Sequence, residues 1–154
     1  MFKNLYLSAA VWTGLGLAAG LFYREFTKTN RFEGVTQLAV AHTHALALGM
    51  IVMLTVLALA RAFSLDAPGI RIFVWVYNIG LAITFGMLVI KGTLQVLGSP
   101  IATSAGLAGI AGLGHMTITG ALVWLFIVLG RAVRAADAET ASAEMPTAVA
   151  RDIA

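Results

Sequence analysis

The histidines are the residues of this sequence whose chemistry is hardest to explain by packing alone. The chain has three of them, and each lies within a stretch apolar enough to span a membrane. His42 and His44 form a pair two residues apart, and His115 follows a run of glycines and alanines. Neutral imidazole is a common metal ligand, and an ionisable side chain at membrane depth is costly. We therefore take the three histidines as candidate ligands of a metal or of a metal-containing cofactor.

The spacing of the histidine pair argues against a compact ion site on one helix face. Residues two apart on an α-helix point about 200° from each other. His42 and His44 therefore serve two sites, or one binds a ligand while the other faces a neighbouring helix or subunit. The small residues around the pair and before His115 allow close helix packing, and they equally leave a slot for a porphyrin. The pattern favours a large planar cofactor such as a haem, with His42, His44 and His115 as candidate ligands.

Three polar side chains are candidates to bind the haem propionates. Lys91 and Gln95 are four residues apart and share a helix face, and Arg24 is expected near the same membrane surface. The alternative for Lys91 is a lysine that extends along apolar surface to reach water. We include Arg24, Lys91 and Gln95 in the predicted cofactor site.

Copper or another transition metal is the alternative to haem. Methionine thioethers are soft ligands that suit Cu(I), although methionine also fills apolar helices as a packing residue. The methionines close to the histidines are Met50, Met53 and Met116. Two further alternatives are a proton or small-solute pathway through Lys91, Glu25 and the histidines, and a structural subunit packed by its glycines.

The elements that must position these side chains are transmembrane helices. The 154 residues are 60% hydrophobic and 11% charged, whereas soluble domains are roughly 25% charged. The apolar runs are long enough to cross a hydrocarbon core, which takes about 20 residues. We expect an all-α integral membrane four-helix bundle over residues 1–134. Its spans are predicted at about residues 5–23, 36–60, 72–97 and 105–129.

Turn-forming residues separate the predicted spans. Residues 66–69, Asp-Ala-Pro-Gly, have the composition of a turn, and residues 98–100, Gly-Ser-Pro, are expected to end the third span. Residues 135–154 are rich in alanine and glutamate and cannot bury a core, so they are predicted to form a mobile polar tail.

Composition and charge argue against several classes of protein. Cysteine is absent, which excludes disulfides, iron–sulfur clusters and covalent c-type haem. The net charge is +3, but the basic residues are scattered at span ends, which is typical of membrane anchors rather than of nucleic-acid binding. No Ser/His/Asp or paired-carboxylate arrangement suggests a hydrolase. A slight excess of basic residues beside the termini favours cytoplasmic termini in the membrane.

One segment resembles a known family. Residues 40–50, Val-Ala-His-Thr-His-Ala-Leu-Ala-Leu-Gly-Met, resemble the His-x-His helix of the catalytic subunit of haem–copper oxidases. In that family the two histidines ligate two different haems from opposite faces, within a ring of three four-helix arcs. A four-span chain with its pair on the second span resembles one such arc. The resemblance implies a homo-oligomer, a trimer that recreates three arcs, with an unknown redox partner.

The chain as a whole is similar to an uncharacterised family of four-span bacterial membrane proteins. The similarity rests on residues 21–26, Leu-Phe-Tyr-Arg-Glu-Phe, followed by residues 36–38, Thr-Gln-Leu, and the His-Thr-His segment. It implies a multi-pass protein of the bacterial cytoplasmic (inner) membrane and assigns no activity. The chain has neither a vicinal His-His pair nor a copper histidine crosslinked to tyrosine. We expect haem-based electron transfer or diatomic gas binding, and whether the chain is an oxidoreductase stays open.

Overall fold

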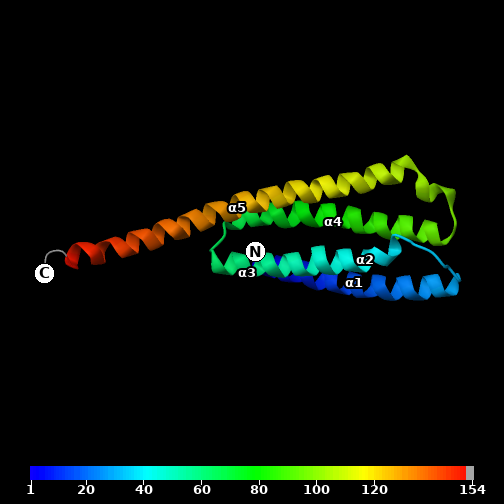
Figure 1. The fold of residues 1–154 in the computed structure, drawn as a ribbon, viewed down its shortest axis with the longest axis horizontal. Helices are drawn as coiled ribbons and strands as arrows, with labels where there is room; N and C mark the ends of the chain where they lie inside the picture. Colours follow the sequence, from blue (N-terminus) through cyan, green and yellow to red (C-terminus); the bar gives the residue numbers. More distant parts are fainter. Residues whose placement is uncertain (152–154) are drawn as a thin grey trace.

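The fold is helical throughout the part of the chain that the structure describes (Figure 1). The computed structural model describes the backbone of residues 1–151 and the side chains of residues 1–142. In chain order the elements are α1 (Phe2–Thr29), α2 (Leu38–His44), the π-helix η1 (Ala45–Ile51), α3 (Val52–Ala62), α4 (Ala67–Val96), the 3₁₀-helix η2 (Pro100–Thr103) and α5 (Ala105–Arg151). α2, η1 and α3 follow one another without a break and form the second span.

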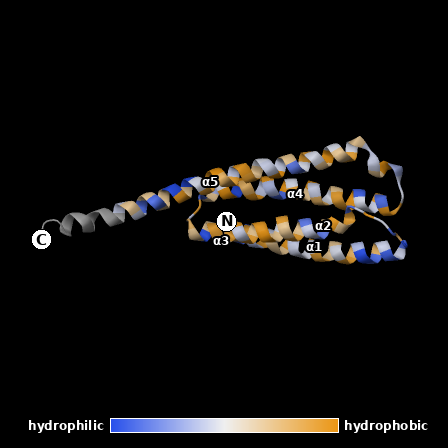
Figure 2. Cartoon of the chain, viewed as in Figure 1, coloured by the Kyte–Doolittle hydropathy of each residue, from blue (hydrophilic) through white to orange (hydrophobic). Residues whose placement is uncertain are grey.

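Within the described residues, four helices are long and apolar enough to cross a membrane. They are Phe2–Thr29, Leu38–Ala62, Ala67–Val96 and Ala105–Ser142. Figure 2 shows that hydrophilic residues gather toward the ends of these helices. Large apolar side chains also point outward along the spans, such as Phe126 at 69% exposed and Leu21 at 66%. The predicted all-helical chain with four long apolar helices is confirmed, and its outward-facing surface suits lipid.

The third span begins earlier than predicted, because residues 66–69 start a helix instead of forming a separate turn. Asp66 is the N-cap of α4, and its Oδ2 accepts a hydrogen bond of 2.8 Å from the backbone N–H of Gly69. Pro68 lies in the first turn, where its missing N–H costs no intrahelical hydrogen bond. The same composition thus serves as a helix start.

The break after the third span lies where it is predicted. α4 ends at Val96, and Gly98 follows with φ +66°. This left-handed conformation is readily adopted by glycine because it has no Cβ. Pro100 then opens the short helix η2, which leads into α5.

The segment predicted as a mobile tail is helical as far as the structure describes it. α5 continues from the fourth span to Arg151 without interruption. Alanine has the highest helix propensity of all residues, so an alanine-rich segment can prolong a helix without burying a core. Residues 152–154 lie outside the described residues, and the mobility of the segment stays a prediction.

α4 is the central helix of the structure. α1 packs along α2, η1 and α3, while α4 contacts α2 on one side and α5 on the other. Within the described residues α5 contacts only α4 and η2. In Figure 1, α5 runs along α4 and lies apart from α1 and α2. The bundle therefore has an open edge at α5.

Glycines let α4 approach both of its neighbours closely. A Cβ added at Gly92 would overlap the backbone of Leu38 in α2. On the other side, a Cβ at Gly80 would lie 2.9 Å from the backbone nitrogen of Ile118, and one at Gly114 would lie 2.9 Å from the backbone nitrogen of Thr84. Small residues at helix contacts give this kind of close packing in membranes. They fix the register of α4 against α2 and α5.

Two polar groups on α4 tie it to α1 and to the second span. Asn78 accepts a hydrogen bond of 2.7 Å from the indole N–H of Trp12 and donates one of 3.3 Å to Ser8 Oγ. The hydroxyl of Tyr77 donates a hydrogen bond of 3.0 Å to the carbonyl of Leu48, inside the π-helix. Paired in this way, the polar groups can lie at membrane depth.

The glycine contact between α4 and α2 can be tested by substitution. Gly92→Ala should destabilise the protein by about 1–3 kcal/mol, because the methyl group has no room beside the backbone of Leu38. Gly86→Ala on the same helix meets nothing within 4 Å and should be neutral or stabilise by about 0.5–1 kcal/mol. Thermal unfolding of the detergent-solubilised protein measures both changes. Equal effects of the two substitutions would contradict the close contact.

Candidate haem site at the outward-facing histidines

His44, the last residue of α2, has one ring nitrogen engaged by its own helix. Its Nδ1 lies 2.9 Å from the carbonyl oxygen of Val40, one turn earlier. A carbonyl can only accept, so Nδ1 is the donor, and in the neutral ring Nε2 then keeps its lone pair. A hydrogen bond of this kind fixes the tautomer and ring orientation of metal-binding histidines. The ring is half-exposed.

His115 on α5 has the same arrangement. Its Nδ1 lies 2.9 Å from the carbonyl oxygen of Ala111, which again leaves Nε2 as the available acceptor. The side chain is exposed. His44 and His115 are therefore chemically alike, since both are prepared to coordinate through Nε2.

His44 and His115 are both rotated around their helices from the close contacts that α2 and α5 make with α4. His115 follows Gly114, which contacts α4, and so points about 100° away from that contact. His44 comes six residues after Leu38, which also contacts α4, and this spacing rotates it by about 120°. Both side chains thus point away from these contacts with α4.

His42 faces the opposite way from His44 and lies against α1. A Cβ added at Gly20 of α1 would lie 3.7 Å from the Cβ of His42. The Nδ1 of His42 is buried and has no hydrogen-bond partner among the described residues. The sequence-based expectation that His42 and His44 serve different neighbours agrees with this placement.

The helix contacts show that His44 and His115 lie at similar depths. Leu38 lies beside Gly92, and α2 runs antiparallel to α4, so His44 lies roughly level with Gly86 on α4. Gly114 lies beside both Gly80 and Thr84, so His115 lies nearly level with the midpoint between those two residues. The difference is about five residues, or on the order of 7 Å along the helix axis.

The glycines before His115 divide into two groups with different roles. Gly114 packs against α4, where an added Cβ would contact Thr84 Oγ1 at 2.5 Å. Gly106, Gly109 and Gly112 face open space, with no atom within 4 Å of an added Cβ. The predicted slot beside His115 is therefore open surface of α5 rather than a gap inside the chain.

The three predicted propionate-binding residues occupy different environments. Gln95 is already engaged, because its Oε1 accepts a hydrogen bond of 2.7 Å from the backbone N–H of Gln37. Lys91 is half-buried one turn earlier on α4. Arg24 is 74% exposed and its Nε lies 3.7 Å from a carboxylate oxygen of Glu25. Gln95 therefore supports the start of the second span, while Lys91 and Arg24 stay candidates for anionic groups.

A compact metal centre is not found within the part of the chain that the structure describes. No group of three metal-ligating histidine, cysteine or carboxylate residues comes together there. Met53 is fully buried in the core, whereas Met116 is 65% exposed beside His115. Met53 and Met116 therefore lie in different environments, and copper binding stays an alternative prediction.

The π-helix immediately after the histidine pair is a feature that the sequence does not predict. Residues Ala45–Ile51 bond with the wider i→i+5 pattern. A Cβ added at Gly49 would overlap Trp12 of α1, and Tyr77 binds Leu48 from α4. Isolated π-helical turns often lie at functional sites. The π-helix thus follows His44 directly, and it is held by Trp12 of α1 and by Tyr77 of α4.

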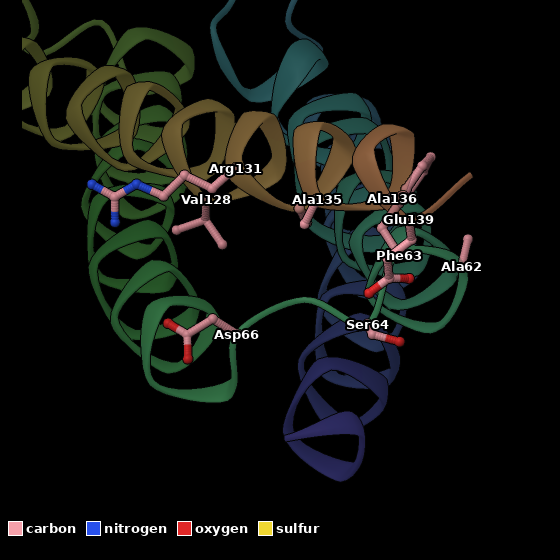
Figure 3. Close-up of a pocket in the computed structure, with 10 residues that line it drawn as sticks. Ala62, Phe63, Ser64, Asp66, Val128, Arg131, Ala135, Ala136 and Glu139 are labelled. Carbon is pink, nitrogen blue, oxygen red and sulfur yellow. The ribbon is translucent and has the colours of Figure 1, made fainter. Parts of the chain in front are cut away.

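A separate cleft lies at the opposite end of the spans (Figure 3). It has a volume of about 550 Å³ and lies between the α3–α4 connection and α5. Asp66, Arg131 and Glu139 contribute charged groups to its lining. The carboxylate of Asp66 already caps α4, and the three histidines are not among the lining residues. We therefore place the candidate site at the histidines.

Comparison with known proteins identifies the family of this four-span helical chain. A family model described as "Protein of unknown function (DUF2871)" matches residues 2–132. The match covers most of the chain, so the chain belongs to that family. No curated protein and no solved structure matches it. The resemblance to haem–copper oxidases therefore stays a prediction that rests on residues 40–50.

The structural role of Gln95 gives a test that is independent of any cofactor. Gln95→Ala should lower the stability of the apoprotein by about 1–2 kcal/mol, because the N–H of Gln37 loses its acceptor at the start of the second span. Thr93→Ala, at a half-buried position two residues away, serves as the control. Thermal unfolding of protein prepared without haem measures the difference. No loss in Gln95→Ala would mean that this hydrogen bond contributes nothing to stability.

Proposed function

We propose that this protein binds haem b in the membrane through His44 and His115. The observation that carries the proposal is the shared state of these two residues. Each has Nδ1 hydrogen-bonded to the carbonyl four residues earlier, and each keeps Nε2 for a ligand on an outward face. The resemblance of residues 40–50 to the His-x-His helix of haem–copper oxidases supports the same cofactor.

The cost of polar groups in lipid supports a functional role for these imidazoles. A histidine side chain that faces hydrocarbon loses its hydrogen bonds to water. Histidines retained only for helix packing are expected to point into the bundle, as His42 does toward Gly20. His44 and His115 are instead directed away from the contacts with α4, where a bound group would satisfy Nε2.

The surface around His115 fits a flat cofactor. Gly112 lies one turn before His115, and an added Cβ there would meet nothing within 4 Å. A helix surface without side-chain bulk lets a planar ring lie close to the backbone. Lys91 lies about one turn nearer the loop end than the level of His44 and would pair with a propionate. Arg24, closer still to the membrane surface, is the second candidate for this role.

The proposed chemistry is electron transfer, with diatomic gas binding as the alternative outcome. Haem iron held by two imidazoles transfers electrons, whereas iron held by one keeps a position open for a gas. In our proposal the protein is a homo-oligomer, a trimer that closes a ring of helical arcs. We place it in the bacterial cytoplasmic membrane with cytoplasmic termini and a redox partner whose identity is unknown.

An absorption spectrum of the purified protein tests this proposal directly. Protein expressed with ample haem should show a Soret band that shifts on reduction, with haem extractable by acid because the chain has no cysteine for covalent attachment. His44→Ala and His115→Ala should each change the spectrum or remove most of the bound haem. Metal analysis of the same sample distinguishes iron from copper.

Neighbouring residues provide matched controls. Ile51→Leu and Met116→Leu alter exposed positions near the two histidines and should leave the spectrum unchanged. A wild-type protein without a Soret band would refute haem binding. If both histidine variants keep the wild-type haem content and spectrum, His42 becomes the candidate ligand instead.

A further inference from the structure

We infer that the two axial ligands of one haem come from two copies of the chain, His44 from one copy and His115 from its neighbour. This inference rests on the proposed haem site and specifies how that site is assembled. A single chain would then carry two half-sites and no complete one. Oligomer formation would be part of cofactor binding.

The first argument is the separation of the two histidines within one chain. α4 packs between α2 and α5, and those two helices do not contact each other in the described part of the chain. Helices that pack directly have axes ~8–10 Å apart, so α2 and α5 are separated by more than one helix spacing. Two imidazoles on one iron must bring their nitrogens within about 4 Å, twice a metal–nitrogen bond of ~2 Å.

The second argument is the direction of the side chains. A shared iron inside one chain would require His44 and His115 to converge across α4. Each instead lies about 100–120° around its helix from a residue that contacts α4, Leu38 in α2 and Gly114 in α5. Convergence on one iron across α4 would therefore require both side chains to turn back over that helix.

The third argument concerns the two edges of the bundle. α5 forms one edge, because within the described residues it packs only on α4 and η2. The outer faces of α1 and of the second span lie beyond α4 on the other side. If copies associate head to tail, the α5 edge of one copy meets the second span of the next. A head-to-tail interface of this kind closes into a ring when its rotation permits.

The exposed faces suit another copy of this chain better than they suit lipid. Ala108, Gly112 and Thr119 share the outer face of α5 with His115, and all of them are exposed. On the second span, Thr43 is exposed beside His44. Lipid chains cannot satisfy an imidazole nitrogen, whereas a second copy that shares a metal-bound haem can. The similar depth of the two histidines allows them to reach the same cofactor.

Mixed oligomers test this inference. One chain carries His44→Ala with one affinity tag, and a co-expressed chain carries His115→Ala with a different, histidine-free tag. Sequential purification on both tags isolates oligomers that contain both chains. Each variant expressed alone should lack the two-imidazole spectrum. The mixed oligomer should regain it, at about one third to one half of the wild-type haem per chain for a cyclic trimer or dimer.

The matched control has the same number of histidines in a different arrangement. It pairs the wild-type chain with a chain that carries both substitutions. Ligation between copies predicts no haem in a mixed dimer of this kind, and less haem than ligation within one chain predicts in a mixed trimer. Ligation within one chain predicts haem in this control and none in the test pair, which would overturn the inference.

Two further outcomes keep this inference separate from the proposed function. A wild-type chain without haem refutes the proposed function itself. A wild-type chain that binds haem as a monomer in detergent, with no mixed oligomer recovered on the two tags, overturns only the inference about two copies.

Discussion

The close packing of α4 against its two neighbours is the constraint on which the rest of the structure depends. The absence of a side chain at Gly92 lets α2 approach α4, and its absence at Gly80 and Gly114 lets α5 approach from another side. Backbone contacts of this kind tolerate no methyl group, so they fix both the distance and the axial register of the three helices. That register sets the depths of His44 and His115. It also leaves α5 attached to the bundle through α4, with its far side open.

The polar side chains of the spans differ in whether they hydrogen-bond across helices or only to their own helix, and this difference bears on function. Trp12, Asn78 and Tyr77 hydrogen-bond across helices inside the bundle, which is the ordinary way in which a membrane protein satisfies such groups. Nδ1 of His44 and of His115 bonds to the backbone of its own helix, and no hydrogen bond of the second nitrogen is found among the described residues. A residue whose role is to join helices would use that nitrogen inside the bundle. This difference is the basis of the proposal that the two histidines bind a ligand.

The sequence predicts those features that depend on hydrophobicity and helical period. The length of the apolar runs is sufficient to predict four membrane-spanning helices, and the two-residue spacing predicts that His42 and His44 point in different directions. Features that depend on a specific neighbour could not be predicted. The π-helix needs Trp12 and Tyr77 beside it, and Gln95 caps the second span only because α4 brings it to Gln37. Likewise, the sequence does not predict that Gly114 packs against α4 while Gly106, Gly109 and Gly112 face open space.

The proposed chemistry depends on the assembly of the protein as much as on its residues. A haem held only by His115 or only by His44 would keep one axial position free and would favour gas binding. A second imidazole would fill that position and would suit the same iron to electron transfer. In the arrangement that we infer, the second imidazole belongs to another copy. The interface between copies would then determine the coordination number of the iron, and with it which of the two functions the protein performs.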